Sequence, residues 1–438
     1  MRQVHALLVL FVLGLSSAAS AQVDEPERLR IHGSNRLGAN LVPAMVESWL
    51  KSIDYVGIRR REAGPTRTEI SASRDGQALI VEIDKRGTAA GINAIIEGKA
   101  DISMSARRPT AQEIDDAWQL GGLSSSTQEF VVAIDGLALV TAPGNRISEL
   151  SLSQLRDVLS GKTRDWRELG GHAGPIVVHA PGTNTGTHEL LTQLVLAGGK
   201  ISPRAKRHAS YARIVAAIDA DPNGIGVIGL RAPRGKLKVL AIRDGTRALT
   251  PNMLSVASED YPLSQRLYLH VGGLVTALGR GFAQYAISPA GQDVVAHSQF
   301  VSLGLRPMQA DESDNTPQEY RQIVGNAKRL PMTLHFAKGL DLFDSRGRQD
   351  VERLATFLSR PENAQRKVVL VGFANPEPKA PYQSLSFSQE RVDFVASELL
   401  ALNMKVVTVR GMGGRMNLAD ARQPSARYRN ERVEVWLR

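Results

Sequence analysis

Short apolar runs alternate with amphipathic stretches along the chain up to residue 306. The pattern predicts strands at residues 78–83, 131–134 and 176–179, and helices at residues 41–53 and 152–159. Strands interleaved with helices are typical of an α/β domain, in which ligands bind outside the carboxyl ends of the strands.

The character of the chain changes at residue 307, where a polar, acidic stretch bracketed by prolines begins. This composition is typical of a linker, which we place at residues 307–329. The elements predicted after it are, in order, a strand at 334–336, a helix at 345–358, a strand at 368–372, a helix at 386–401, and strands at 406–409 and 433–437. This βαβαββ order predicts a smaller α+β domain at residues 330–438.

The N-terminus has the pattern of a cleaved signal peptide at residues 1–21. Arg2 provides a positive start, residues 6–15 are apolar, and the small residues 19–21 form a cleavage site. The apolar run is shorter than the about 20 residues that a membrane-spanning helix needs. We therefore expect the mature chain to be exported to the periplasm.

Composition excludes several classes of function. The sequence has no cysteine, which rules out disulfides, thiolate catalysis, thiolate metal sites and lipid attachment at a cysteine. A net charge of +10 would suit nucleic acid, but export and an aromatic content of 5% argue against that partner. Because the basic residues are spread along the chain, we expect most of them to be solvated and expect no nucleic-acid partner.

The candidate chemistry centres on a loop rich in glycine and threonine, residues 182–187, which runs into a predicted helix at residues 189–196. Such a loop presents backbone N–H groups and hydroxyls at a helix N-terminus, where the helix dipole favours negative charge. The sequence contains no P-loop, no two-carboxylate metal constellation and no His-Glu-x-x-His motif. We therefore expect an oxyanion-binding protein and not an enzyme, with no catalytic residue, metal or cofactor.

Further segments around this loop carry a family resemblance. Residues 132–140, 150–162 and 165–171, followed by the loop, closely resemble the solute-binding proteins of bacterial ABC phosphate transporters, the PstS-like family. Residues 31–38, 95–109, 224–230 and 286–294 fit the same template. The resemblance implies a two-lobed periplasmic-binding-protein-like clamshell at residues 22–306, with crossings between lobes near 107–114 and 256–268, and an ABC transporter permease as partner.

The resemblance also places the family's phosphate loops on this sequence. The implied phosphate-binding residues are Ser34, Asn35, Thr88, Ser105, Arg107, Thr185, Gly186 and Thr187. The chain departs from the family at Pro181, where the family usually has an arginine, and Arg107 is the candidate for the missing guanidinium. It also departs at Ala89 and Ala90, where the family is richer in glycine and serine. Phosphate or another small oxyanion is the expected ligand.

The C-terminal region resembles the OmpA-like peptidoglycan-binding domain. The resemblance rests on residues 369–375, 385–392, 410–414 and 430–435, in the family's order. It implies that Arg391 contacts a carboxylate of the peptidoglycan stem peptide, while Asn375 occupies the position of the family's aspartate.

The sequence therefore predicts a periplasmic solute-binding protein that captures phosphate or a related oxyanion and is tethered to the cell wall. An alternative stays open: an envelope attachment or assembly protein that uses the clamshell to bind a protein or glycan, with no role for free phosphate.

Overall fold

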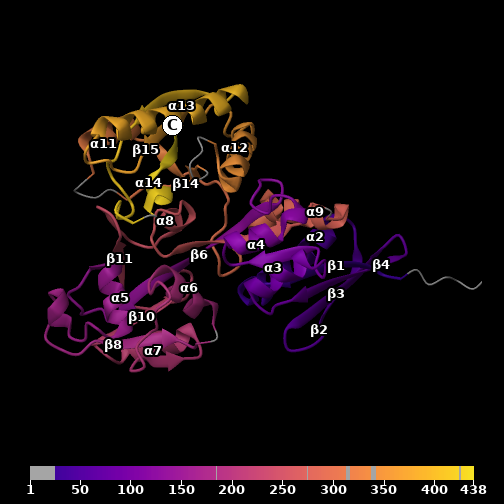
Figure 1. Cartoon of the computed structure of the whole chain (residues 1–438), viewed down its shortest axis with the longest axis horizontal. Helices are drawn as coiled ribbons and strands as arrows, with labels where there is room; N and C mark the ends of the chain where they lie inside the picture. The colour runs from indigo at the N-terminus through magenta and orange to yellow at the C-terminus, as the bar shows by residue number, and fades with distance from the viewer. Residues whose placement is uncertain (1–24, 184, 274, 312–315, 337–341, 424–425) are drawn as a thin grey trace, which may run out of the picture.

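Two β-sheets organise the computed structural model, which describes residues 25–183, 185–273, 275–311, 316–336, 342–423 and 426–438 (Figure 1). The predicted signal peptide and residues 312–315 of the predicted linker lie outside the described residues. The larger sheet has 13 strands and the smaller one has four. Three main apolar cores accompany them, one in each half of the larger sheet and one against the smaller sheet.

The first half of the large sheet forms lobe 1, with strand order β2-β3-β4-β1-β5-β13-β6. Its strands are β1 (Glu27–Gly33), β2 (Val56–Glu62), β3 (Arg67–Arg74), β4 (Gln77–Asp84), β5 (Ile102–Ser105), β6 (Glu129–Thr141) and β13 (Ser264–Val271). Its helices are α1 (Asn35–Gly38), α2 (Leu41–Ser52), α3 (Thr88–Ile96), α4 (Ala111–Asp116), α9 (Ala277–Ile287) and α10 (Pro289–Ala296), with a 3₁₀ turn at Trp118–Leu120. Strand β1 is parallel to both β4 and β5, so these three strands end at the same edge of the sheet.

Lobe 2 continues from β6 through β10, β8 and β9, and β11 joins β6 to β7 and β12. Its strands are β7 (Glu149–Ser151), β8 (Val177–Pro181), β9 (Lys206–His208), β10 (Gly224–Gly229), β11 (Lys238–Arg243) and β12 (Ala248–Leu249). Its helices are α5 (Leu152–Ser160), α6 (Gly186–Leu194), α7 (Tyr211–Asp219) and α8 (Met253–Ala257), with a 3₁₀ turn at Trp166–Leu169. Helix α6 begins at Gly186, three residues before the predicted start at Glu189.

Strand β6 connects the two lobes, and all 13 of its residues are buried. Residues 129–136 pair with β13 in lobe 1, whereas residues 137–141 pair with β10 and β11 in lobe 2. The first crossing therefore lies inside β6, and the prediction near residues 107–114 was wrong because helix α4 still contacts lobe 1. The return crossing, from α8 to β13, falls within the predicted residues 256–268. We call residues 134–137 and 258–263 the hinge.

The C-terminal domain has a four-stranded sheet of order β14-β17-β15-β16. Its elements are α11 (Gln318–Val324), β14 (Lys328–His335), α12 (Ser345–Leu358), β15 (Val368–Phe373), α13 (Pro381–Ala401), β16 (Val406–Gly411), α14 (Ala426–Asn430) and β17 (Arg432–Leu437). The predicted α+β order is present, with two helices added: α11, which lies within the predicted linker, and the short α14. Helix α13 begins five residues before the predicted position because Pro381 occupies its first turn, where proline costs no hydrogen bond.

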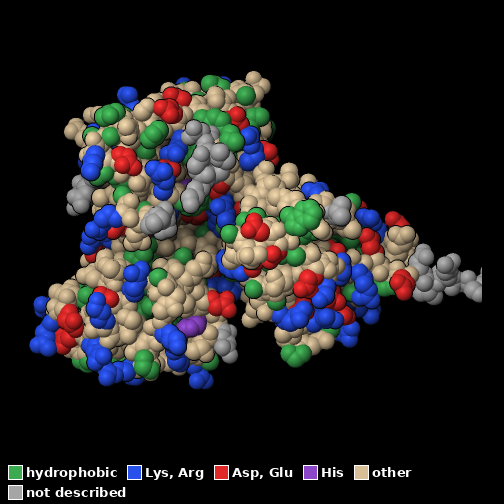
Figure 2. Space-filling view, viewed as in Figure 1, with side chains coloured by type: hydrophobic (Ala, Val, Ile, Leu, Met, Phe, Trp, Pro, Cys, Tyr) green, Lys and Arg blue, Asp and Glu red, His purple; other side chains and the backbone are tan. Residues whose placement is uncertain are grey.

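The C-terminal domain packs over the hinge side of the clamshell (Figure 1). Lysine and arginine side chains are spread over all three parts of the visible face, as the sequence predicted, and a hollow lies where the parts meet (Figure 2). Among the residues that the structure describes, no helix combines the length and the apolar character that a membrane crossing requires.

Candidate functional site

Three loops of lobe 1 meet at the carboxyl ends of β1, β4 and β5. The N–H of Gly87 donates to the carbonyl of Gly33 over 2.8 Å, and the N–H of Ser34 donates to the carbonyl of Met104 over 2.8 Å. The hydroxyl of Thr88 accepts from the N–H of Ala106 over 3.0 Å. These bonds hold the loops that carry the predicted residues Ser34, Thr88 and Ser105 against one another, in the place where α/β sheets bind ligands.

Two glycines allow this close approach. A β-carbon on Gly91 would overlap the α-carbon of Gly33, and a β-carbon on Gly33 would overlap the carbonyl of Met104. Gly33 also has a φ of 140°, which side chains disfavour. The first turn of α3 therefore lies directly against the loop after β1. A side chain at either Gly33 or Gly91 would prevent this approach.

Helices α1 and α3 begin at these loops without a side-chain cap. Neither Ser34, the N-cap of α1, nor Gly87, the N-cap of α3, accepts a hydrogen bond from its helix through a side chain. The first N–H groups of a helix have no partner inside the helix, so an anion is a natural acceptor for them. Ser34 is 3% exposed, which places its hydroxyl inside the protein.

The N-terminus of α6 carries the predicted residues of lobe 2. The hydroxyl of Thr185 donates to the carbonyl of Gly182 over 2.8 Å and accepts from the N–H of His188 over 3.3 Å, so it caps the helix. The hydroxyl of Thr187 is buried and forms a short hydrogen bond with the hydroxyl of Tyr211. Thr185 therefore shapes the loop, Gly186 is partly exposed at the start of the helix, and Thr187 packs inward against Tyr211.

Arg36 connects the two lobes, and sequence reasoning missed its role. A β-carbon on Gly186 would overlap the side chain of Arg36, so this lobe 1 residue lies directly against the start of α6. Its guanidinium forms an ion pair with Asp135 of β6 and its side chain is 11% exposed, whereas its Nη1 is buried without a partner. Burial lowers the pKa of Arg36, although Tyr211 and Glu189 oppose this shift. The site therefore contains a buried guanidinium with unused donor capacity.

Arg107, the predicted replacement for the missing arginine, is already engaged. Its guanidinium donates to both carboxylate oxygens of Glu113 over 2.7 and 2.8 Å. The hydrogen bond to Glu113 raises the pKa of Arg107 and, reciprocally, lowers the pKa of Glu113. The backbone carbonyl of Arg107 accepts from the buried hydroxyl of Ser105, and Asn35 is exposed. No pattern in the sequence marks Arg36, because its role depends on the contact with Gly186 in the other lobe.

The two predicted residues of the C-terminal domain bond to two consecutive residues of the chain, Asn430 and Glu431. The side-chain oxygen of Asn375 accepts from the side-chain N–H of Asn430 over 2.9 Å. Arg391 donates over 2.9 Å to Glu431, the residue that follows Asn430. The guanidinium of Arg391 lies 5.3 Å from the ring centre of Phe336. The Nε and Nη1 atoms of Arg391 are buried without a partner. These two atoms can therefore donate hydrogen bonds to a further carboxylate.

No group of three or more histidines or carboxylates suited to hold a metal ion occurs within the described ranges. The geometry instead offers hydroxyls, helix N-termini and one buried guanidinium, which is the chemistry of anion binding.

A family model described as a PBP superfamily domain matches residues 70–290. Among curated proteins, the phosphate-binding protein PstS of Staphylococcus saprophyticus is 26% identical over 220 residues, which are 49% of this chain and 67% of that protein. PstS of Staphylococcus epidermidis is 27% identical over 205 residues, covering 45% of this chain and 62% of that protein. Protein SphX of Synechococcus elongatus is 27% identical over 227 residues, which are 48% of this chain and 66% of that protein. The chain thus spans about two thirds of the length of these relatives.

Two solved structures share the fold of the clamshell. An ABC-type phosphate transport receptor from Vibrio cholerae superposes with a TM-score of 0.51 at 19% identity, covering 63% of this chain and 99% of the receptor. A possible phosphate-binding protein from Planctomyces limnophilus gives a TM-score of 0.50 at 19% identity, and the superposition covers 64% of this chain and 94% of that protein. The family model and the three curated relatives each cover about half of this chain, and the family model ends before the C-terminal domain begins.

Proposed function

Because the chain belongs to the PBP superfamily, whose model matches residues 70–290, we propose that its two lobes capture phosphate or a related oxyanion. The anion binds between the loops of lobe 1 and the N-terminus of α6. The named relatives are binding proteins and receptors, which agrees with the prediction that the chain is not an enzyme. They favour this reading over a purely adhesive envelope protein. In the proposed role the protein works in the periplasm and delivers its ligand to an ABC transporter permease.

The buried guanidinium of Arg36 against Gly186 is the observation that carries this proposal. Its free Nη1 is a charged donor at the start of α6, and the uncapped N-termini of α1 and α3 add amide donors from lobe 1. A hydrogen bond to a charged group contributes about 1.5–3 kcal/mol, so a few such bonds fixed in place suffice for tight binding. Arg36 thus supplies the charge that Pro181 cannot.

Titration calorimetry tests the proposal. Phosphate is titrated into the mature chain at neutral pH, with sulfate as a competitor that separates phosphate selectivity from general anion binding. Thr187→Ala is the test variant and Thr192→Ala, on the same helix, is its matched control. Saturable binding that Thr187→Ala weakens and Thr192→Ala leaves intact supports the proposal. Absence of heat and of thermal stabilisation by any of the anions rejects it.

We further propose that the C-terminal domain holds the protein on peptidoglycan through Arg391 and Asn375. The two free donors of Arg391 suit a carboxylate of the stem peptide. Asn375 provides an amide oxygen for an ammonium group but no charge, so we expect weaker retention than an aspartate would give. Co-sedimentation of the mature chain with isolated peptidoglycan tests this part independently of phosphate.

A further inference from the structure

The C-terminal domain is bonded to both lobes, rather than joined to the clamshell by the linker alone. On the lobe 1 side, Ser345 forms a short hydrogen bond with Glu129 of β6, and Gln349 donates to the carbonyl of Glu129 over 2.9 Å. On the lobe 2 side, Arg429 donates to Asp244 over 2.6 Å. A body that is bonded to both lobes restrains the angle between them.

The same domain also grips the hinge. Asp344, the N-cap of α12, accepts from Arg266 of β13 over 2.7 Å, and both side chains are 4% exposed. Arg266 and Arg346 together hold the carboxylate of Glu259, a hinge residue with a φ of 62°, which non-glycine residues rarely adopt. Separating these buried charges is costly, so the hinge cannot change shape without rearranging the contact with the C-terminal domain.

Helix α14 joins this hinge contact to the Arg391 site. Within α14, the hydroxyl of Tyr428 donates to Asp344 over 3.0 Å, and Arg429 contacts lobe 2. The last residue of the helix, Asn430, bonds to Asn375 of the candidate wall site, and the residue after it bonds to Arg391. Consecutive residues of this short helix therefore contact two different places: Tyr428 and Arg429 contact the hinge side, and Asn430 contacts the candidate peptidoglycan site of Asn375 and Arg391.

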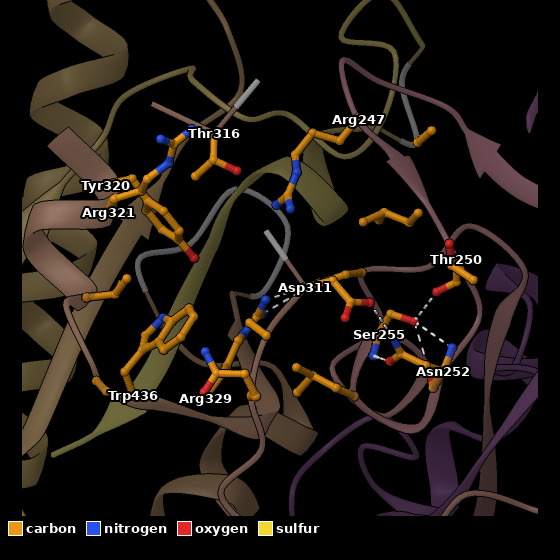
Figure 3. A pocket seen from close by; sticks show the side chains of 18 of the residues that line it. Arg247, Thr250, Asn252, Ser255, Asp311, Thr316, Tyr320, Arg321, Arg329 and Trp436 are labelled. Carbon is orange, nitrogen blue, oxygen red and sulfur yellow. Dashed lines mark hydrogen bonds and ion pairs between the residues drawn. The ribbon is translucent and has the colours of Figure 1, made fainter. Parts of the chain in front are cut away.

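The interface beside α14 contains a cavity of about 410 Å³ (Figure 3). Lobe 2 contributes Arg247 and Asn252 to its wall, and the C-terminal domain contributes Tyr320 and Trp436. The domains thus meet here around a hollow lined by both polar and apolar side chains instead of through a continuous apolar core. Interfaces of this kind allow relative movement of domains.

We propose that α14 couples ligand binding at Arg391 to the opening and closing of the clamshell, so that wall contact changes the affinity for the oxyanion. A ligand carboxylate at the free Nε and Nη1 of Arg391 places a second negative charge beside Glu431, which weakens the bond of Glu431 to Nη2 and displaces the end of α14. Tyr428 and Arg429 transmit that displacement to Asp344 and to lobe 2. By linkage, an anion that closes the lobes must change wall binding by the same factor. The coupling rests on both parts of the proposed function.

Inter-lobe distances test the coupling directly. Because the sequence has no cysteine, spin labels can be placed at Asn93→Cys on α3 and Ala216→Cys on α7, both exposed. Distances are measured by pulsed electron resonance with and without phosphate. The probe for Arg391 is meso-diaminopimelate, the component of the peptidoglycan stem peptide that supplies the carboxylate, and it is likewise added or left out. In the parent chain we expect meso-diaminopimelate to shift the distances and to change the phosphate affinity by at least about fivefold.

Two variants break the proposed connection. Asp344→Asn keeps a helix cap but loses the charge, and Tyr428→Phe removes only a hydroxyl, so at least the second should fold. Both should shift or broaden the inter-lobe distances without any ligand and abolish the effect of meso-diaminopimelate. The matched controls are Asp393→Asn, on the exposed side of α13, and Tyr382→Phe, whose side chain is 71% exposed.

The outcomes separate this inference from the proposed function. If phosphate and meso-diaminopimelate each bind but neither alters the affinity for the other, the coupling is wrong while the proposed function stands. If phosphate does not bind, the proposed function fails. In that case the inter-lobe distances measured without ligand decide whether α14 couples the two parts. Distances that are the same in the parent, Asp344→Asn and Tyr428→Phe chains would overturn it.

Discussion

Replacing Arg36 with methionine should weaken phosphate binding more than any other single change in lobe 1. The substitution keeps most of the side chain's length against Gly186 and removes the one buried guanidinium at the start of α6. The loss of one charged hydrogen bond, about 1.5–3 kcal/mol, corresponds to about a tenfold to hundredfold weaker affinity, since about 1.4 kcal/mol is tenfold.

The same substitution leaves Asp135 unpaired, and its side chain is only 5% exposed. An uncompensated buried charge costs about 3–5 kcal/mol, so Arg36→Met alone should also lower the melting temperature. The double variant Arg36→Met/Asp135→Asn removes both charges and should recover most of that stability. Its affinity for phosphate should stay low, which separates loss of the ligand contact from loss of the fold.

Arg107→Met is the matched comparison, because the guanidinium of Arg107 is bound to Glu113. We expect this variant to change phosphate affinity by less than threefold in calorimetric titrations. The reasoning fails if Arg36→Met/Asp135→Asn folds and binds phosphate as the parent does, or if Arg107→Met produces the larger loss.

Three further predictions concern stability and wall binding. Burial lowers the pKa of His335 to about 3, so below its usual value of 6.5 the unfolded chain binds a proton that the folded chain does not. Stability should therefore fall as the pH drops from 6.5 towards 3, by up to about 1.4 kcal/mol per pH unit, and His335→Gln should flatten this slope in denaturant titrations. Gly91→Ala should lower the melting temperature and weaken phosphate binding because its β-carbon overlaps backbone, whereas Gly281→Ala, with its nearest neighbour at 3.9 Å, should be neutral or stabilising. Arg391→Ala should reduce co-sedimentation with peptidoglycan more than Arg348→Ala does, and equal retention of the two variants would contradict the assigned role.

Each helix and strand that the repeating apolar pattern predicted corresponds to an element of the structure, because burial on one face imposes a period on the sequence. It could not show where the chain changes lobes. Residues 129–141 form one continuous buried strand, and its partners change from β13 to β10 after Gly136. The pair Asp135-Gly136 interrupts the apolar run at this point, but the periodicity does not reveal that the strand continues into the other lobe. The family resemblance placed this crossing near residues 107–114, and that prediction was wrong.

The loops of the candidate site could be predicted because glycines and hydroxyls cluster locally before helices. Arg36 could not, since its role depends on a partner in the other lobe, Gly186, which is far away in sequence. The contacts between Asp344 and Arg266 are of the same kind: single charged residues without a pattern, brought together only by the packing of two domains. Long-range ion pairs of this kind become visible only in a structure.

A crystal structure of the mature chain grown with phosphate tests the central claim most directly. The account predicts a tetrahedral anion between Arg36 and the N–H groups at the start of α6, also contacted by the loops that carry Ser34 and Thr88. No anion at these residues at saturating phosphate, or an anion bound only away from them, would contradict it.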